Sequence, residues 1–154
     1  CAPPPGTQIT LLDPNRNVLA RSGRRLAAMN PTTIEADVMK PLPVDGRFDS
    51  AALSFVLHCL RSPMSNKAVA IRNVADVLKP DGVLFGSTVL GISERHSLPA
   101  RAVLRAFNWH GDFDNLGDTV EGLRAILEES FTSVEVDVVG STAHFTATGP
   151  RGTR

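Results

Sequence analysis

The chain has 154 residues, of which 42% are hydrophobic and 21% charged, which suits one globular domain. Sixteen basic residues balance sixteen acidic ones, and this zero net charge argues against nucleic acid or an anionic membrane as the main partner. No apolar segment is long enough to span a bilayer, and the Pro-rich start lacks the pattern of a secretion signal.

The first part of the chain alternates strand and helix signals. Residues 8–12 form a continuous β-branched and aliphatic run, which predicts a buried strand that ends at Asp13. A helix is predicted over residues 15–29, capped by the asparagine at its start. A second strand is expected over residues 32–36, and it too ends at an aspartate, Asp37.

The middle of the chain repeats this alternation. Residues 49–56 predict the most strongly buried strand. The next segment predicts a helix that Ser65 or Asn66 caps and that the Pro-Gly stretch 80–82 ends. Residues 82–91 then predict another strand that is buried on both faces.

The last third begins less regularly. Ser97 is expected to cap a helix, which a polar, Gly-rich segment over residues 108–118 follows. Asp118 and Glu121 match a capping box, which predicts the start of one more helix. Two alternating strands joined by a tight turn at Gly140 complete the chain.

Strands separated by helices predict βαβ units and therefore a mostly parallel sheet. The two strands around Gly140 are expected to form an antiparallel hairpin at one edge. The fold class is thus predicted to be an α/β three-layer sandwich in a single domain over residues 1–154.

The two aspartates at the strand ends are the first candidate functional residues. In an open parallel sheet, ligands bind at the carboxyl ends of the strands, where Asp13 and Asp37 are expected to lie. One carboxylate there can accept hydrogen bonds from a ribose diol, and its neighbour can accept one from an exocyclic adenine amine. The alternative is that each aspartate merely starts a turn or caps a helix, and it is favoured for either residue taken alone. Their occurrence at two successive strand ends favours the nucleoside site.

The order of the segments LLDPN…VL, EADVMKPLP, FDSAALSFVLHCL and VLKPDGVLFGSTVLG resembles the class I S-adenosylmethionine-dependent methyltransferases. The similarity is greatest to small bacterial members that act on low-molecular-weight substrates. It implies a Rossmann-like sheet and S-adenosyl-L-methionine as cofactor. By this resemblance, Asp13 with Pro14 beside it holds the ribose, and Asp37 holds the adenine with Val38 against the ring. Ser54, at the end of the family's fourth strand, would border the methyl group.

The sequence departs from the family at its start. No Gly-x-Gly-x-Gly turn occurs, so the match begins at the family's second strand and the central first strand is missing. Two strand edges would then lack hydrogen-bond partners. The chain could be a fragment completed by another chain or another segment, could pair its second and fourth strands directly, or could associate through its open edges. The fragment is the favoured interpretation.

Two histidines are candidate catalytic residues. His58 follows the strand 49–56, and a neutral imidazole there could take a proton from the acceptor. The alternative is a partly buried histidine bonded to a loop carbonyl. His110 lies in residues 92–118, the predicted substrate cover, where Trp109 and Phe113 could stack on a flat substrate. The alternative is a loop that packs its aromatic rings on the core.

Other chemistry is less well supported. No histidines or cysteines stand at metal-ligand spacing, so no metal site is predicted. Cys1 and Cys59 make no disulfide framework and are expected to be free thiols in the cytoplasm, with Cys59 buried. The predicted function is therefore methyl transfer to a small-molecule acceptor whose identity the sequence does not give. Two alternatives remain, a non-catalytic fragment or partner subunit that binds no cofactor by itself, and a nicotinamide-dependent reductase, which would also need a glycine-rich first turn.

Overall fold

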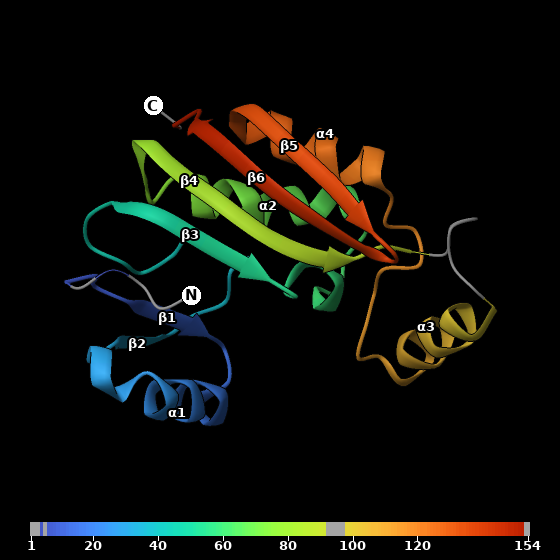
Figure 1. Cartoon of the computed structure of the whole chain (residues 1–154), viewed down its shortest axis with the longest axis horizontal. Helices are drawn as coiled ribbons and strands as arrows, with labels where there is room; N and C mark the ends of the chain where they lie inside the picture. Colours follow the sequence, from blue (N-terminus) through green and yellow to red (C-terminus); the bar gives the residue numbers. More distant parts are fainter. Residues whose placement is uncertain (1–3, 5, 92–97, 153–154) are drawn as a thin grey trace. The chain divides into compact units, whose positions relative to one another are not determined.

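A computed structural model describes residues 4, 6–91 and 98–152 (Figure 1). The chain divides into two compact units, Cys1–Asp45 and Gly46–Arg154. Each unit is an α/β arrangement, and each is described by itself.

The first unit is a single βαβ arrangement, drawn in blue in Figure 1. Strand β1 spans Thr10–Asp13, helix α1 spans Arg16–Arg25, a 3₁₀ turn covers Ala27–Met29, and strand β2 spans Thr32–Glu35. The side chain of Asn15 accepts hydrogen bonds from the first turn of α1, as the sequence predicts. Helix α1 buries one side chain, that of Leu19, and packs on both strands.

The two strands of this unit run parallel and in register. Thr10 pairs with Thr32, and Asp13 pairs with Glu35. One further hydrogen bond, from the Ala36 N–H to the Asp13 carbonyl oxygen at 3.3 Å, extends the ladder past the end of β2. The parallel direction and the adjacent carboxyl ends therefore agree with the prediction.

The second unit is a four-stranded sheet with helices. Its elements in chain order are β3 (Phe48–Ser54), the 3₁₀ turn η2 (Leu57–Cys59), α2 (Met64–Ala75), β4 (Leu78–Val89), α3 (Leu98–His110), α4 (Val120–Ser130), β5 (Phe131–Val139) and β6 (Thr142–Pro150). The strand order is β3-β4-β6-β5. Strand β3 pairs parallel to β4, whereas β6 runs antiparallel to both β4 and β5. Three of the four strands therefore share one direction, and the predicted C-terminal hairpin is present.

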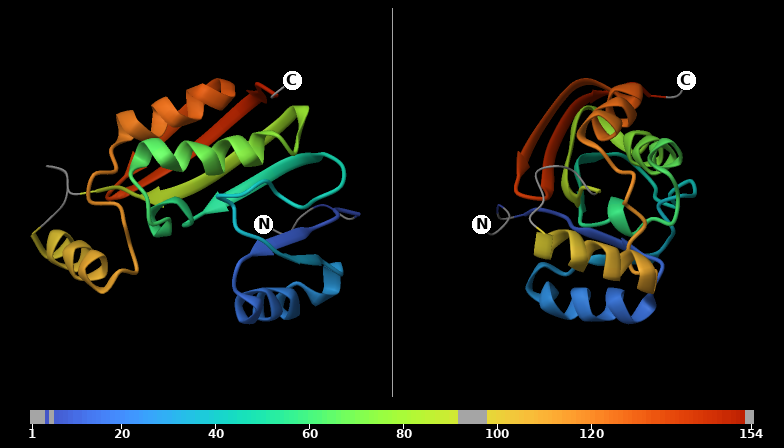
Figure 2. Two further views of the ribbon diagram at one scale, coloured as in Figure 1. Left: turned by 180° about the vertical axis from the view of Figure 1, so that it is seen from behind. Right: turned by 90° about the vertical axis from the view of Figure 1, so that its right-hand side faces the viewer.

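Helices α2 and α4 lie side by side on one face of this sheet, as the rear view in Figure 2 shows. Each buries its apolar side against the sheet and against its neighbour. The core between them contains the fully buried side chains of Leu57, Ile71, Leu78, Leu84, Leu123, Leu127 and Phe131. Within the described residues, no helix is long and apolar enough to cross a lipid bilayer.

The predicted boundaries of α2 and of the strand that follows it are wrong. Pro63 occupies the N-cap of α2 and offers no side-chain hydrogen bond, so neither Ser65 nor Asn66 caps this helix. The helix ends at Ala75, and the stretch 80–82 lies inside β4, where the pairing register with β3 shifts between Phe48 and Ser50. This irregularity accommodates Pro80, which has no N–H to give to a regular ladder.

The last helices also differ from the prediction. Helix α3 continues to His110, so the predicted polar loop over 108–118 begins only after that residue. Thr119, whose side chain accepts from the Gly122 N–H, caps α4 in place of Asp118. The proposed cap at Ser97 lies outside the described residues.

Candidate active site

The first unit brings two predicted carboxylates to adjacent strand ends. Asp13 is the last residue of β1, and Asp37 stands two residues past the end of β2. One oxygen of Asp13 accepts the Asn15 N–H at 2.7 Å, and one oxygen of Asp37 accepts the Met39 N–H at 2.9 Å. Each aspartate thus starts a turn, as the alternative interpretation expects, but only one of its two oxygens is used in doing so.

A cavity of about 330 Å³ lies beside Asp37. Its lining consists of Pro14, Glu35, Ala36, Asp37, Lys40, Pro41 and Pro43. Asp13 is not among the lining residues, although Pro14, next to it, is. Val38 is half-buried in the turn that follows. Three prolines and an alanine line it together with the charged side chains of Glu35, Asp37 and Lys40, and this mixture of apolar surface and polar groups suits a flat heterocycle.

The second unit places His58 at the carboxyl end of β3, in η2. The residue is 3% exposed, and its Nδ1 accepts the Val89 N–H at 3.2 Å, with the Thr88 hydroxyl 3.4 Å away. Because Nδ1 accepts, the proton of the neutral ring is on Nε2. Burial lowers the pKa of His58, and the nearby Lys67 ammonium lowers it further. His58 is therefore a neutral imidazole that presents a donor rather than a lone pair at Nε2.

A row of aromatic rings extends from His58. Its ring centroid is 4.5 Å from that of Phe113 in an edge-on contact and 5.8 Å from that of Phe55. Phe113 in turn stacks on Phe107 of α3 at 4.9 Å. The structure thus brings together two of the predicted site residues, His58 and Phe113.

Trp109 and His110 do not join this row. Trp109 is 84% exposed on α3, and its ring contacts that of His110 at 5.0 Å. His110 is also exposed. No described ring contact joins Trp109 to Phe113, and their stacking on one flat substrate stays a prediction.

Phe55 has a backbone conformation that bulky residues rarely adopt. It follows Ser54, the last residue of β3, with φ of 59°, and its side chain is 53% exposed. A left-handed conformation costs a residue with a Cβ roughly 1–2 kcal/mol. The Phe55 N–H donates to the Ser87 carbonyl at 2.8 Å, which holds the backbone in this turn. Strain of this kind gathers at functional sites, and here it marks the strand end where Ser54 was expected to border the methyl group.

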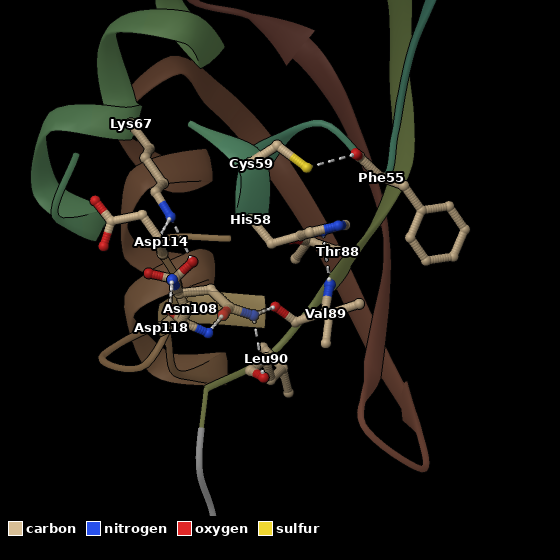
Figure 3. Close-up of polar contacts among 11 residues, drawn as sticks. Phe55, His58, Cys59, Lys67, Thr88, Val89, Leu90, Asn108, Asp114 and Asp118 are labelled. Carbon is tan, nitrogen blue, oxygen red and sulfur yellow. Dashed lines mark hydrogen bonds and ion pairs between the residues drawn. The ribbon is translucent and has the colours of Figure 1, made fainter. Parts of the chain in front are cut away.

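A buried ion pair that the sequence did not reveal lies near His58 (Figure 3). The Nζ of Lys67 on α2 is 2.6 Å from Asp118 Oδ2, and both side chains are almost completely buried. The same Nζ donates to the Asp114 carbonyl at 2.7 Å. Burial raises the pKa of Asp118, and the hydrogen bond from Lys67 opposes this rise. The sequence signal was the position of Lys67 four residues before Ile71, on the apolar side of α2.

Asn115 is a second missed residue, 1% exposed. Its side-chain amide donates to the carbonyl oxygen of Val89 at 2.8 Å, and its Oδ1 accepts from Asn108 at 2.9 Å. It therefore ties the end of β4 to the last turn of α3. Nothing in a lone asparagine of a polar stretch distinguishes this role from an ordinary turn residue.

Cys59 is exposed, contrary to the prediction that it is buried. Its thiol lies 3.8 Å from the Phe55 carbonyl oxygen, at the end of η2, where the chain turns toward solvent. Partial burial nevertheless raises the pKa of this thiol, so Cys59 is poorly suited to act as a nucleophile. Among the described residues, no group of three or more histidine, cysteine or acidic side chains could hold a metal ion.

The fold and the strand-end carboxylates define a class, that of α/β proteins of Rossmann-like type that bind ligands at the carboxyl ends of parallel strands. Comparison with known proteins narrows this class. The methyltransferase domain family matches residues 1–84. A putative uncharacterized protein of Escherichia coli K12, YbcY, is 38% identical over 151 residues, which are 96% of this chain and 78% of YbcY.

Further relatives carry names that state an activity. Demethylluteothin O-methyltransferase of Streptomyces thioluteus is 38% identical over 80% of this chain and 54% of its own length. The crystal structure of the N-methyltransferase NodS of Bradyrhizobium japonicum WM9 with S-adenosyl-L-homocysteine superimposes with a TM-score of 0.66 at 18% identity, over 94% of this chain and 67% of NodS. Other relatives are fungal, so the similarity is not confined to bacterial proteins. This chain belongs to the methyltransferase domain family, and it spans little more than half the length of such named relatives as the luteothin enzyme.

The resemblance to class I methyltransferases is thereby confirmed, as is the Rossmann-like α/β fold class with mostly parallel strands and an antiparallel hairpin. The roles of individual site residues remain predictions.

Proposed function

We propose that this chain contributes to S-adenosylmethionine-dependent methyl transfer to a small-molecule acceptor, with Asp13 and Asp37 holding the nucleoside part of the cofactor. The observation that carries the proposal is the register of β1 and β2. It sets Asp13 beside Glu35, two residues before Asp37, on the same edge of a parallel pair. Relatives named as methyltransferases support the same conclusion.

The residues present fit a nucleoside. Each aspartate has one oxygen fixed by its own turn, so the carboxylate is oriented. Within the described residues, these turns do not use the second oxygen, which can accept a hydroxyl or amine hydrogen. A volume of about 330 Å³ is at the lower end of the range for ligand pockets and is adequate for part of a cofactor. Pro14 and Asp37 would lie against the base or sugar, with Val38 next to them.

When bound, the cofactor supplies a methyl group that its sulfonium charge already activates. The task of the protein is then to hold the reactants close and aligned, which can be worth roughly 7–11 kcal/mol. Ser54 and Phe55 at the end of β3 are proposed to border the reacting methyl group. Residues 92–118 are proposed as the substrate cover, with Trp109 and Phe113 as its aromatic contacts.

The proposed role of His58 changes with its geometry. Nδ1 is engaged by the Val89 N–H, so His58 in this tautomer would donate from Nε2 to an oxygen of the acceptor. Proton removal from the acceptor would then fall to His110, which is exposed on α3, or to water. Names of relatives suggest oxygen or nitrogen as the methylated atom.

A second candidate is a non-catalytic partner that binds no cofactor by itself. It is favoured by the absence of a Gly-x-Gly-x-Gly turn anywhere in the sequence. β1 and β3 are also edge strands of their own sheets. An added strand, from a dimer partner, a complementing chain or another segment of the protein, would then complete the cofactor site. A cytoplasmic location is proposed with either function.

Calorimetric titration with S-adenosylmethionine decides between the two candidates. Binding by the wild-type chain that weakens about ten- to hundredfold in D13N and in D37N supports the cofactor site, since each variant loses hydrogen bonds to a charged group. Asp45→Asn, in the exposed end of the same unit, is the matched control and should bind like wild type. No heat from any of these proteins, with folding verified by circular dichroism, supports the non-catalytic partner.

A further inference from the structure

Lys67 has no solvent exposure, and its charge is in the interior of the second unit. Burying an ion pair is costly, and apolar residues of similar size often give equal or greater stability. A buried pair therefore calls for an explanation other than stability, and the contacts of Lys67 supply one.

Lys67 and the His58 region bind the same backbone residue from opposite sides. The Asp114 N–H donates to the His58 carbonyl at 2.8 Å, and the Asp114 carbonyl accepts from Lys67 Nζ at 2.7 Å. Phe113, directly before Asp114, packs its ring on the imidazole of His58. Holding Asp114 at both its N–H and its carbonyl thus limits the positions that Phe113 can take beside His58.

The Asp118 carboxylate completes the arrangement. The carboxylate accepts from Lys67 at 2.6 Å. The backbone carbonyl of Asp118 accepts the N–H of Gly91, just past β4, at 2.7 Å. Residues 111–118, here called the α3–α4 connection, are therefore bonded to α2, to η2 and to the end of β4 (Figure 3). The fastening extends to α3 through the stacked rings of Phe107 and Phe113.

We propose that Lys67 is a positioning residue that holds the α3–α4 connection, and with it Phe113, in a single position against His58 at the acceptor side of the site. The catalytic meaning of this role rests on the proposed function. The structural part of the proposal, that the buried Lys67 ammonium holds the carbonyl of Asp114, is independent of the proposed function.

The first experiment replaces the buried pair by apolar side chains, in K67M/D118L, and follows amide hydrogen exchange by NMR. We expect urea unfolding at neutral pH to remain cooperative. Protection of the Asp114 amide should fall at least about tenfold relative to core amides, because Asp114 loses the bond from a charged donor at its carbonyl oxygen and is then held only through its N–H to the His58 carbonyl. Trp109 is the only tryptophan, so the anisotropy of its fluorescence reports independently on α3 and should fall as well.

The matched control is the exposed pair of Lys79 and Asp49, which has the same 2.6 Å separation. K79M/D49L should change neither the protection of Asp114 nor the anisotropy of Trp109. Unchanged protection of Asp114 in a folded K67M/D118L variant would overturn the proposal.

A second variant decides the case in which K67M/D118L does not fold. Asp118→Asn removes the partner charge but leaves Lys67 able to donate to the Asp114 carbonyl. Retained protection at Asp114 in D118N supports the proposal, and protection lost there to the level of frayed amides contradicts it.

A third readout separates positioning from folding and uses the full chain with labelled S-adenosylmethionine and 2-naphthol as a flat acceptor probe. In K67M/D118L, kcat should fall tenfold or more while the KM for S-adenosylmethionine stays within about twofold, because misplacement of a reacting group costs rate rather than cofactor affinity. An equal kcat in both proteins would contradict the proposal. Absence of transfer by the wild-type chain would count against the proposed function alone, and the exchange measurements would still decide the role of Lys67.

Discussion

Protonation of His58 should destabilise the second unit as the pH falls below neutral. The ring is 3% exposed, and its Nδ1 accepts the Val89 N–H, so a proton added at Nδ1 would set two donors against each other. Burial lowers the pKa of this histidine below its ordinary 6.5, and the charge of Lys67 adds to the effect. In the unfolded chain His58 regains that ordinary pKa.

Proton linkage gives the direction and the size of this change in the free energy of unfolding. Above pH 6.5 both states are neutral at His58 and the residue has no effect on the pH dependence. Below it the unfolded state binds the proton first, so the free energy of unfolding decreases as the pH falls. The slope is at most about 1.4 kcal/mol per pH unit for one proton. Between pH 7.5 and 5.5 the loss is therefore at most about 1.4 kcal/mol, because only the lower of these two pH units lies below the unfolded pKa.

Urea unfolding followed by ellipticity at 222 nm, at pH 7.5, 6.5 and 5.5, measures this loss. His58→Asn keeps an acceptor near the Val89 N–H and removes the titration, so its stability should vary less with pH than that of wild type. Comparing the two proteins cancels the contribution of Asp118, whose pKa burial raises and which therefore acts in the opposite direction. H144N, at an exposed position of β6, is the matched control and should retain the wild-type dependence. Identical pH dependence in H58N and wild type would refute the assignment of a buried neutral imidazole.

Three further predictions concern packing and backbone strain in the second unit. A Cβ added at Gly86 would lie 2.3 Å from the Leu53 carbonyl oxygen, so G86A should lower the free energy of unfolding by at least about 1–3 kcal/mol. G117A is the control, because its Cβ would meet nothing within 4 Å, and its urea midpoint should equal that of wild type. Because Phe55 has φ of 59°, F55G should be more stable than F55A by roughly 1–2 kcal/mol in the same assay, and equal stabilities would mean that the left-handed backbone is absent. Asn115→Ala leaves buried hydrogen-bond partners unsatisfied and should cost about 2–3 kcal/mol, with a thermal midpoint equal to that of wild type arguing against the network.

Local chemistry made much of the fold predictable from the sequence. The Asn15 cap, the parallel pairing of the first two strands and the hairpin at Gly140 each follow from a few neighbouring residues, and all are present. One error occurred where a long-range partner overrode a local signal. Asp118 has the spacing of a capping residue, but its carboxylate binds Lys67, and Thr119 takes the cap instead.

The same contrast between local signals and long-range partners applies to the residues of the candidate site. The two strand-end carboxylates were found because β-strand order along the chain places them at one edge. Lys67 and Asn115 were missed because their partners are 51 and 26 residues away, and no periodicity in their own segments reports on these distances. His58 was identified as a candidate, but only the hydrogen bond from Val89 shows which of its nitrogens is available.

The long-range contacts of Lys67 and Asn115 have a common physical cause. The segment after β4 must leave the sheet, form α3 and return, and a return path of polar, Gly-rich sequence has little apolar surface with which to fix itself. Directional bonds to buried donors replace that surface: Lys67 holds the Asp114 carbonyl, and Asn115 holds the carbonyl of Val89. A hydrogen bond weakens when its length or angle changes a little, whereas an apolar contact tolerates lateral displacement. A segment held by hydrogen bonds therefore has one position rather than several. A segment held in one position beside His58 fits the proposed function, in which the protein contributes to the rate by aligning the reactants.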